Sequence, residues 1–169
     1  MKKFLLPALL FLGLSGCATE MAPPPPQWNA STDAAAAEYA PYLKPGTATL
    51  AGHAFLTQPG RGVVKAAGRV VTLDPATSVG NEWWEKAGKV WSHHSLVPST
   101  AFAGARRTTV ADTDGRFIFS GLPAGRYYVC TEVTWEIGGY YPTQGGLVGQ
   151  PVTIGDDETK DVILNRHPE

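Results

Sequence analysis

Cysteine, methionine and charge are scarce in this chain of 169 residues. It has two cysteines, Cys17 and Cys130, and two methionines. Charged residues make up 17% of the chain, the net charge is −1, and no basic patch or stripe occurs, which argues against nucleic-acid binding. The sequence also lacks a His-x₃-His pair and cysteine pairs at metal-ligand spacing, so we expect neither a metal nor another cofactor.

Long apolar runs are missing too, apart from one at the start of the chain. Lys2 and Lys3 precede an apolar stretch from Phe4 to Leu14. This stretch is shorter than the about 20 residues that a membrane-spanning helix needs. A positive start followed by a short apolar stretch is typical of a secretory signal.

The apolar stretch ends in Leu14-Ser15-Gly16-Cys17, which resembles the lipobox of bacterial lipoproteins. The resemblance implies that a signal peptide, residues 1–16, is removed and that Cys17 carries lipid, including an acyl chain such as palmitate. It places the protein in the cell envelope, and Ala18 in place of Asp favours the periplasmic face of the outer membrane. The alternative is an ordinary secretory signal with an incidental cysteine. Lipid on Cys17 would leave Cys130 without a partner in its own chain.

Residues 17–46 are expected to form a lipidated tether between the membrane and a folded domain. Pro23–Pro26 favours extended polyproline II, and Ser31 or Asp33 can cap a short helix over residues 34–43. For residues 38–46 the alternative is a first strand or a docking helix of the domain itself.

From Thr47 onward, short alternating segments are separated by Gly, Pro and Asp, which is typical of β-strands. The pattern predicts an all-β fold, a seven-stranded sandwich over residues 47–165 followed by a tail, 166–169. The expected strands are 47–56, 68–73, 107–112, 116–120, 125–137, 150–154 and 160–165. The expected inward side chains are Leu50, Val71, Leu73, Phe117, Phe119, Tyr127, Val129, Val133, Ile154, Val162 and Leu164.

Residues 74–106 are too many for an ordinary connection between strands and are therefore expected to be an insertion. Tryptophans and small apolar residues recur in it at three- and four-residue spacings, which predicts a short amphipathic helix. Aromatic residues and histidines here and in a second connection form a candidate surface for a glycan or a protein: Trp83, Trp84, Trp91, His93, His94, Tyr140 and Tyr141. Alternatively, the tryptophans are buried and hold the insertion against the sandwich. Cys130 is expected to point outward or to be covered by this insertion, and to form no disulfide.

Three stretches together resemble the carboxypeptidase regulatory-like domain, a transthyretin-like (prealbumin-like) Greek-key sandwich. They are Leu50–Phe55 with Lys65–Leu73, then Thr113-Asp114-Gly115-Arg116-Phe117-Ile118-Phe119, then Gly121-Leu122-Pro123-Ala124-Gly125-Arg126-Tyr127-Tyr128-Val129. The resemblance implies a module without catalytic activity. Tyr127 is expected to pack inward, with its hydroxyl bonded to the backbone as corner tyrosines are.

Transthyretin-like hydroxyisourate hydrolases share this fold and provide the enzymatic alternative. His53 and Arg116 resemble parts of their site, but the chain ends in Asn165-Arg166-His167-Pro168-Glu169 and lacks the Tyr-Arg-Gly-Ser ending of those enzymes. We therefore predict no enzymatic activity and no catalytic residues. The predicted function is a membrane-anchored binding or scaffolding lipoprotein with an envelope protein or glycan as its unidentified partner. The alternative within the binding class is a carbohydrate- or peptidoglycan-binding module.

Overall fold

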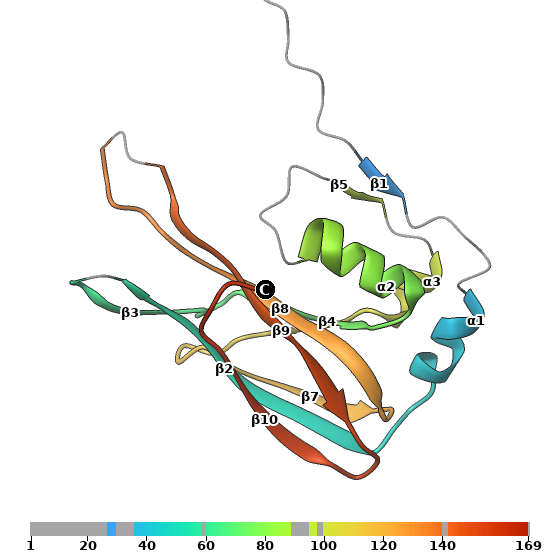
Figure 1. The fold of residues 1–169 in the computed structure, drawn as a ribbon. Helices are drawn as coiled ribbons and strands as arrows, with labels where there is room; N and C mark the ends of the chain where they lie inside the picture. Colours follow the sequence, from blue (N-terminus) through green and yellow to red (C-terminus); the bar gives the residue numbers. More distant parts are fainter. Residues whose placement is uncertain are drawn as a thin grey trace, which may run out of the picture.

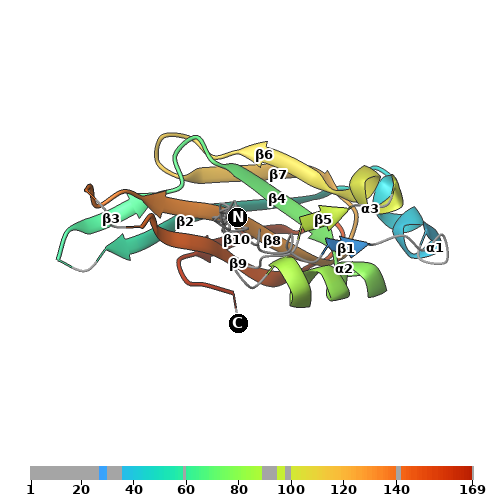
Figure 2. The ribbon, with the colours of Figure 1, turned by 90° about the horizontal axis from the view of Figure 1, so that it is seen from above.

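The computed structural model of this protein describes residues 27–29, 36–58, 60–88, 95–97, 100–139 and 142–168. Its centre is a sandwich of two four-stranded sheets (Figures 1 and 2). Sheet one contains β10 (Thr159–Leu164), β2 (Ala48–Gln58), β3 (Gly62–Lys65) and β7 (Arg116–Leu122). Sheet two has the order β6 (Arg107–Val110), β4 (Val70–Pro75), β8 (Gly125–Trp135) and β9 (Gln144–Ile154).

Strand β2 organises sheet one, because β3, β7 and β10 all pair with it. The pairing of β10 with β2 is parallel, and the other strand pairs of the sandwich are antiparallel. In the described residues the sandwich therefore has eight strands, and the prediction of an all-β sandwich is confirmed while the count of seven is wrong. A separate short parallel pair joins β1 (Gln27–Asn29) to β5 (Ser95–Val97).

The additional strand, β3, and the first half of β9 were both missed by the alternation pattern. Glycines interrupt that pattern, yet in β9 they are what allows the strand to lie close to β8. A Cβ on Gly145 would lie 2.1 Å from the Val133 carbonyl oxygen, and one on Gly149 would lie 2.6 Å from that of Val129. The β8–β9 hairpin thus needs glycine at the positions that made its second strand hard to recognise.

The core lies between the two sheets, and the predicted inward side chains all belong to it. Leu50, Leu73 and Val129 have no exposed surface. Tyr127 also packs inward, and its hydroxyl donates a hydrogen bond of 2.7 Å to the Pro123 carbonyl oxygen, as expected for a corner tyrosine.

The insertion forms α2 (Ser78–Trp83), a π-helical turn (Trp84–Gly88) and α3 (Thr100–Ala105). Thr77 caps α2, because its hydroxyl oxygen accepts a hydrogen bond from the Gly80 amide at 3.0 Å. The insertion covers the outer face of sheet two, where α2 lies above β8 and β4 in Figure 1. None of the helices in the described ranges is long and apolar enough to span a membrane.

The end of the expected tether belongs to the packed domain. Helix α1 (Ala36–Tyr39) continues into a 3₁₀ turn (Ala40–Leu43), and Tyr39 is completely buried against Phe102. The Glu38 carboxylate accepts two bonds of 2.6 Å from Ser78, one from the amide and one from the hydroxyl. For residues 38–46 the buried Tyr39 fits the docking-helix alternative, because a fully buried tyrosine is incompatible with a free tether.

Candidate functional site

Trp83 and Trp84, the first two residues of the predicted aromatic surface, are buried. Their exposed fractions are 7% and 3%. Trp84 stacks on Tyr128, with ring centroids 4.4 Å apart, and Trp83 packs against Phe102. The prediction that these two residues belong to an exposed binding surface is therefore wrong. A helix as short as α2 needs tertiary packing to form, and the tryptophans supply that packing.

The remaining members of the predicted surface lie outside the described residues. They are Trp91, His93, His94, Tyr140 and Tyr141, and the lipidation residue Cys17 lies outside as well. Their predicted roles stay predictions.

A partly buried ion pair holds the insertion against sheet two. Arg106 donates two hydrogen bonds to the Asp74 carboxylate, of 2.6 and 2.9 Å, and its guanidinium lies 5.1 Å from the centre of the Trp83 ring. Burial raises the pKa of the Asp74 carboxyl, and the bonds from Arg106 act in the opposite direction.

Cys130 lies in the same layer, covered by the insertion. Its thiol faces the Gly88 carbonyl oxygen at 3.8 Å, and 5% of the residue is exposed. Burial raises the pKa of this thiol to about 12. Of the two arrangements expected for Cys130, the structure has the covered one, and the thiol forms no disulfide within the described residues.

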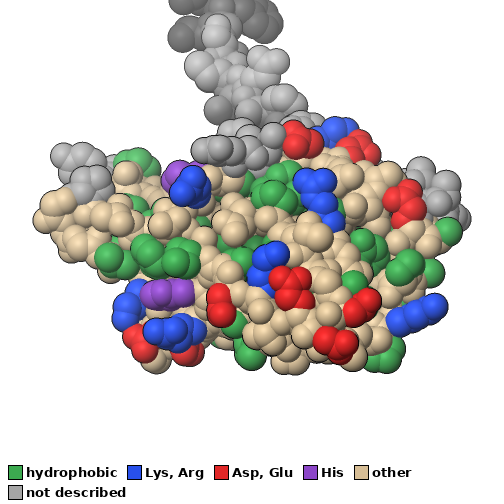
Figure 3. All heavy atoms as spheres, turned by 60° about the horizontal axis from the view of Figure 1, so that its bottom comes forward, with side chains coloured by type: hydrophobic (Ala, Val, Ile, Leu, Met, Phe, Trp, Pro, Cys, Tyr) green, Lys and Arg blue, Asp and Glu red, His purple; other side chains and the backbone are tan. Residues whose placement is uncertain are grey.

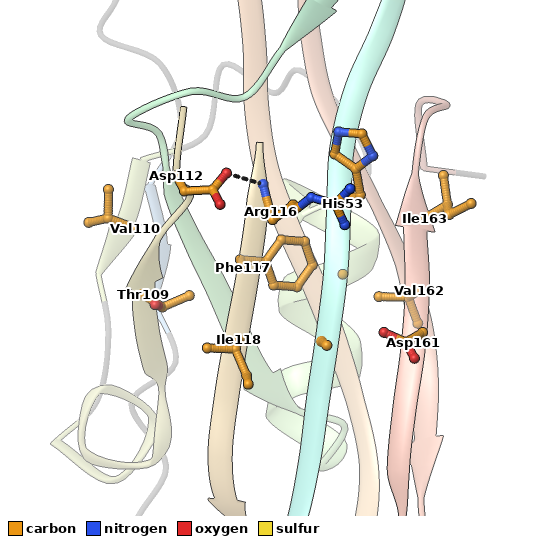
Figure 4. A pocket seen from close by; sticks show the side chains of 12 residues that line it. His53, Thr109, Val110, Asp112, Arg116, Phe117, Ile118, Asp161, Val162 and Ile163 are labelled. Carbon is orange, nitrogen blue, oxygen red and sulfur yellow. Dashed lines mark hydrogen bonds between the residues drawn. The ribbon is translucent and has the colours of Figure 1, made fainter. Parts of the chain in front are cut away.

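An open site lies on the opposite side of the molecule, over sheet one. It is a hollow of about 570 Å³ above β7, β2 and β10, bordered by β6 (Figure 4). The face of sheet one carries positive, negative and apolar side chains close together (Figure 3). The hollow thus combines groups that could contact both the polar and the apolar parts of a ligand.

The strand register arranges the side chains of this hollow in two rows across three strands. In the first row Arg116 of β7 lies opposite His53 of β2, which lies opposite Ile163 of β10. In the second row the order is Ile118, Ala51 and Asp161. These six residues alternate with the inward core residues of the same strands, so their side chains face outward.

The imidazole of His53 is oriented by a neighbouring turn. Its Nε2 lies 2.6 Å from the Asp114 carbonyl oxygen, and because a carbonyl only accepts, Nε2 carries the proton. The ring also contacts Phe55, with centroids 4.9 Å apart. The Nδ1 atom of the neutral ring is therefore the acceptor that remains for a ligand.

The turn beside the hollow is itself well bonded. The Asp112 carboxylate accepts a hydrogen bond of 2.8 Å from the Asp114 amide and one of 2.9 Å from the Arg116 amide, the second of which is drawn in Figure 4. Lys65 bonds the Asp114 carboxylate at 2.6 Å and holds the pKa of that carboxyl below its usual value. Asp112 and Asp114 are thus engaged in the turn, which leaves Asp161 as a carboxylate available to the hollow.

The sequence indicates His53 and Arg116 as residues that resemble parts of a hydrolase site. The structure places them on adjacent strands, directly opposite each other. Sequence reasoning missed Ala51, Ile118, Asp161 and Ile163. Ile118 and Ile163 are each 57% exposed, and a signal for them existed, since both occupy the outward phase of their strands. Among the described residues no three His, Cys, Asp or Glu side chains gather as a metal site would require.

A solved structure from Pseudomonas aeruginosa, that of a candidate carbohydrate-binding protein, is similar to this chain. The two chains are 29% identical, with a TM-score of 0.62, and the match covers 72% of this chain and 90% of that one. The major pilin subunit of Bacillus cereus matches with 17% identity and a TM-score of 0.39, over 73% of this chain and 30% of the pilin. No protein-family model matches the chain, and a search of curated proteins found no significant match. The chain is therefore a β-sandwich domain that resembles the Pseudomonas protein over most of both lengths.

Proposed function

We propose that this protein is a carbohydrate-binding module of the bacterial cell envelope. The observation that carries the proposal is the likeness to the candidate carbohydrate-binding protein of Pseudomonas aeruginosa, which extends over 90% of that chain. This favours the glycan-binding alternative of the sequence analysis over a general scaffolding role.

The hollow on sheet one is the place where we propose that the glycan binds. Its volume of about 570 Å³ lies within the usual range of ligand sites, about 300–1,000 Å³. Ile118 and Ile163 offer apolar surface for the C–H groups of a sugar ring, and Arg116 and Asp161 offer a donor and an acceptor for hydroxyl groups.

The test is calorimetric titration of the mature domain with soluble polysaccharides and peptidoglycan fragments. We expect saturable binding to at least one glycan, and the absence of binding to all of them would overturn the proposal. Ile118→Asp should abolish the binding because it places a charge in the hollow. Val63→Asp is the matched control, since Val63 is 56% exposed but lies on β3 outside the hollow.

We further propose that the chain is a lipoprotein anchored through Cys17 to the outer membrane. The lipobox-like Leu14-Ser15-Gly16-Cys17 supports this. One acyl chain gives only marginal membrane binding, so several are expected on Cys17. Cys17→Ser should release the protein from the membrane fraction of fractionated cells, and equally firm retention of this variant would contradict the anchor.

We also propose that the domain is carboxypeptidase regulatory-like, with a Greek-key transthyretin-like topology. We propose in addition that it has no catalytic activity. The adjacency of His53 and Arg116 is the observation that favours a hydrolase instead. An assay with hydroxyisourate distinguishes them: we expect no hydrolysis above the uncatalysed rate. Hydrolysis that His53→Gln removes would replace the binding function with an enzymatic one.

A further inference from the structure

Four of the six outward residues of the hollow are its corners, and they form two crossing diagonals. Ile163 in the first row and Ile118 in the second are apolar corners, while Arg116 and Asp161 occupy the two polar corners. The middle strand contributes His53 and the smallest side chain, Ala51. Arg116 and Asp161 stand on β7 and β10, which lie two strands apart, about 10 Å across the sheet.

Ala51 gives the hollow its depth. Its neighbours in the row are Ile118 on one side and Asp161 on the other, and directly paired residues have Cβ atoms about 5 Å apart. Both neighbours are longer side chains and rise above the methyl group of Ala51. A large side chain at this position would fill the space between them.

The two polar corners carry opposite charges, and neither is tied up in a close contact within the part of the chain that the structure describes. Among the described residues, neither the Arg116 guanidinium nor the Asp161 carboxylate has a hydrogen bond or an ion pair with another side chain. Lys65 is the main cause of the lowered pKa of the Asp114 carboxyl, and the Arg116 guanidinium adds a smaller effect at a distance. An anionic ligand would be attracted by Arg116 but repelled by Asp161 and Asp112. A cationic ligand would be attracted by the two carboxylates but repelled by Arg116.

We propose that the hollow selects an uncharged glycan, with Arg116 donating to hydroxyl oxygens at one corner and Asp161 accepting from hydroxyl groups at the other. This inference rests on the proposed function and specifies its ligand. A neutral polyol offers donors and acceptors together, so it satisfies both charged corners without adding a charge of its own. Its C–H faces lie against Ile118 and Ile163, and Ala51 leaves the room for the ring.

The test compares three classes of soluble polysaccharide with the mature domain: uncharged glucans, mannans and galactans; polygalacturonate; and chitosan. Titrations are run at low and at high salt. We expect binding to an uncharged member, with an affinity nearly independent of salt because screening acts on charge pairs. Binding confined to polygalacturonate or to chitosan, and weakened by salt, would overturn the inference while leaving the carbohydrate-binding function intact.

Substitutions then locate the site. Arg116→Gln and Asp161→Asn should each weaken the binding by about tenfold, the effect of losing one hydrogen bond to a charged group. Arg61→Gln and Asp156→Asn are matched controls at exposed turn positions outside the hollow and should bind like the parent protein. Ala51→Phe should abolish the binding while the circular dichroism spectrum stays that of the folded domain.

The outcomes separate the two proposals. If no glycan of any class binds, the proposed function itself fails. If an uncharged glycan binds and the Arg116, Asp161 and Ala51 variants bind it as well as their controls do, the function stands and this site is wrong. Should Ala51→Phe fail to fold, the two polar variants, which change surface groups only, still decide the question.

Discussion

Asp74 illustrates what burial does to a single charged residue. Its side chain has no exposed surface, and the carboxylate depends on Arg106 for its bonds. Burying two charges costs desolvation energy, and the pair repays it only while both partners are present. The pair is therefore a sensitive point of the insertion although it lies far from the hollow.

Removing one partner of the Asp74–Arg106 pair should lower the free energy of unfolding much more than replacing both partners. Arg106→Met is expected to lower the free energy of unfolding by about 3–5 kcal/mol because it leaves a buried carboxylate unpaired. The Asp74→Asn/Arg106→Met double variant should recover part of this loss. Lys65→Met, which breaks an exposed pair with Asp114, should change stability far less. Urea denaturation measures all three.

The pH dependence of the Arg106→Met variant has a definite sign. Loss of Arg106 removes the influence that lowers the Asp74 pKa and leaves the burial that raises it. When the pKa of a carboxyl is higher in the folded than in the unfolded protein, the folded protein is favoured at pH values below the unfolded-state pKa of about 3.9. This stabilisation is lost as the pH rises through the folded-state pKa. The deficit of the variant relative to the parent should therefore shrink on acidification.

The Cys130 thiol is expected to be chemically silent in the folded protein. Its pKa of about 12 keeps it protonated where an ordinary thiol, with a pKa of about 8.5, already ionises. In a Cys17→Ser background, iodoacetamide should label Cys130 only after unfolding, with little acceleration between neutral pH and pH 9. Rapid labelling of the native protein would contradict a closed insertion.

At the scale of the elements, adjacent residues of β7 test its register. Phe119 is 5% exposed and packs in the core, whereas Ile118 next to it is 57% exposed. Phe119→Ala should lower the free energy of unfolding by about 3–5 kcal/mol through the cavity it leaves. Ile118→Ala should change it by about 0.5 kcal/mol or less. A larger loss for Ile118→Ala than for Phe119→Ala would contradict this register, because a shift of one residue exchanges the two faces of the strand.

The elements also show what a sequence reveals of this fold and what it conceals. The alternation in β2, β7 and β8 is a local property, so the core side chains were predictable. β3 escaped because its exposed residues, such as Val63, do not alternate with buried ones. The residues of the hollow were harder to predict than the strands. Asp161 and Arg116 are 45 positions apart in the sequence. They reach the same hollow only because β10 and β7 each pair with β2 in a particular register. No local pattern contains that information.

On the scale of the whole molecule, the two outer faces differ. The face of sheet two is closed by α2, α3 and α1, with Trp84, Phe102 and Tyr39 beneath them. The face of sheet one stays open and carries the hollow. The insertion and the hollow thus lie on opposite sides of the sandwich, and we expect substitutions in one to leave the other intact.

Sheet one should depend on its final strand for the whole domain to fold. β10 contributes Val162 and Leu164 to the core and forms six paired positions with β2. A chain ended after Glu158 should therefore show neither a cooperative thermal transition nor protection of β2 amides from hydrogen exchange. A chain ended after Asn165 removes the tail but keeps β10, and it should melt like the full-length protein.

The parallel pairing of β2 with β10 also sets the order in which sheet one can form during synthesis. β2 is the first strand of the sandwich to leave the ribosome and β10 is the last, and the amide of Asp157 just before β10 bonds the hydroxyl of Thr47, 110 residues earlier. Contacts this distant in sequence slow folding, because a long loop must close before they can form. The central strand of sheet one therefore waits, unpaired on one side, until the chain is nearly complete. Topology by itself therefore delays the completion of sheet one until β10 has been made.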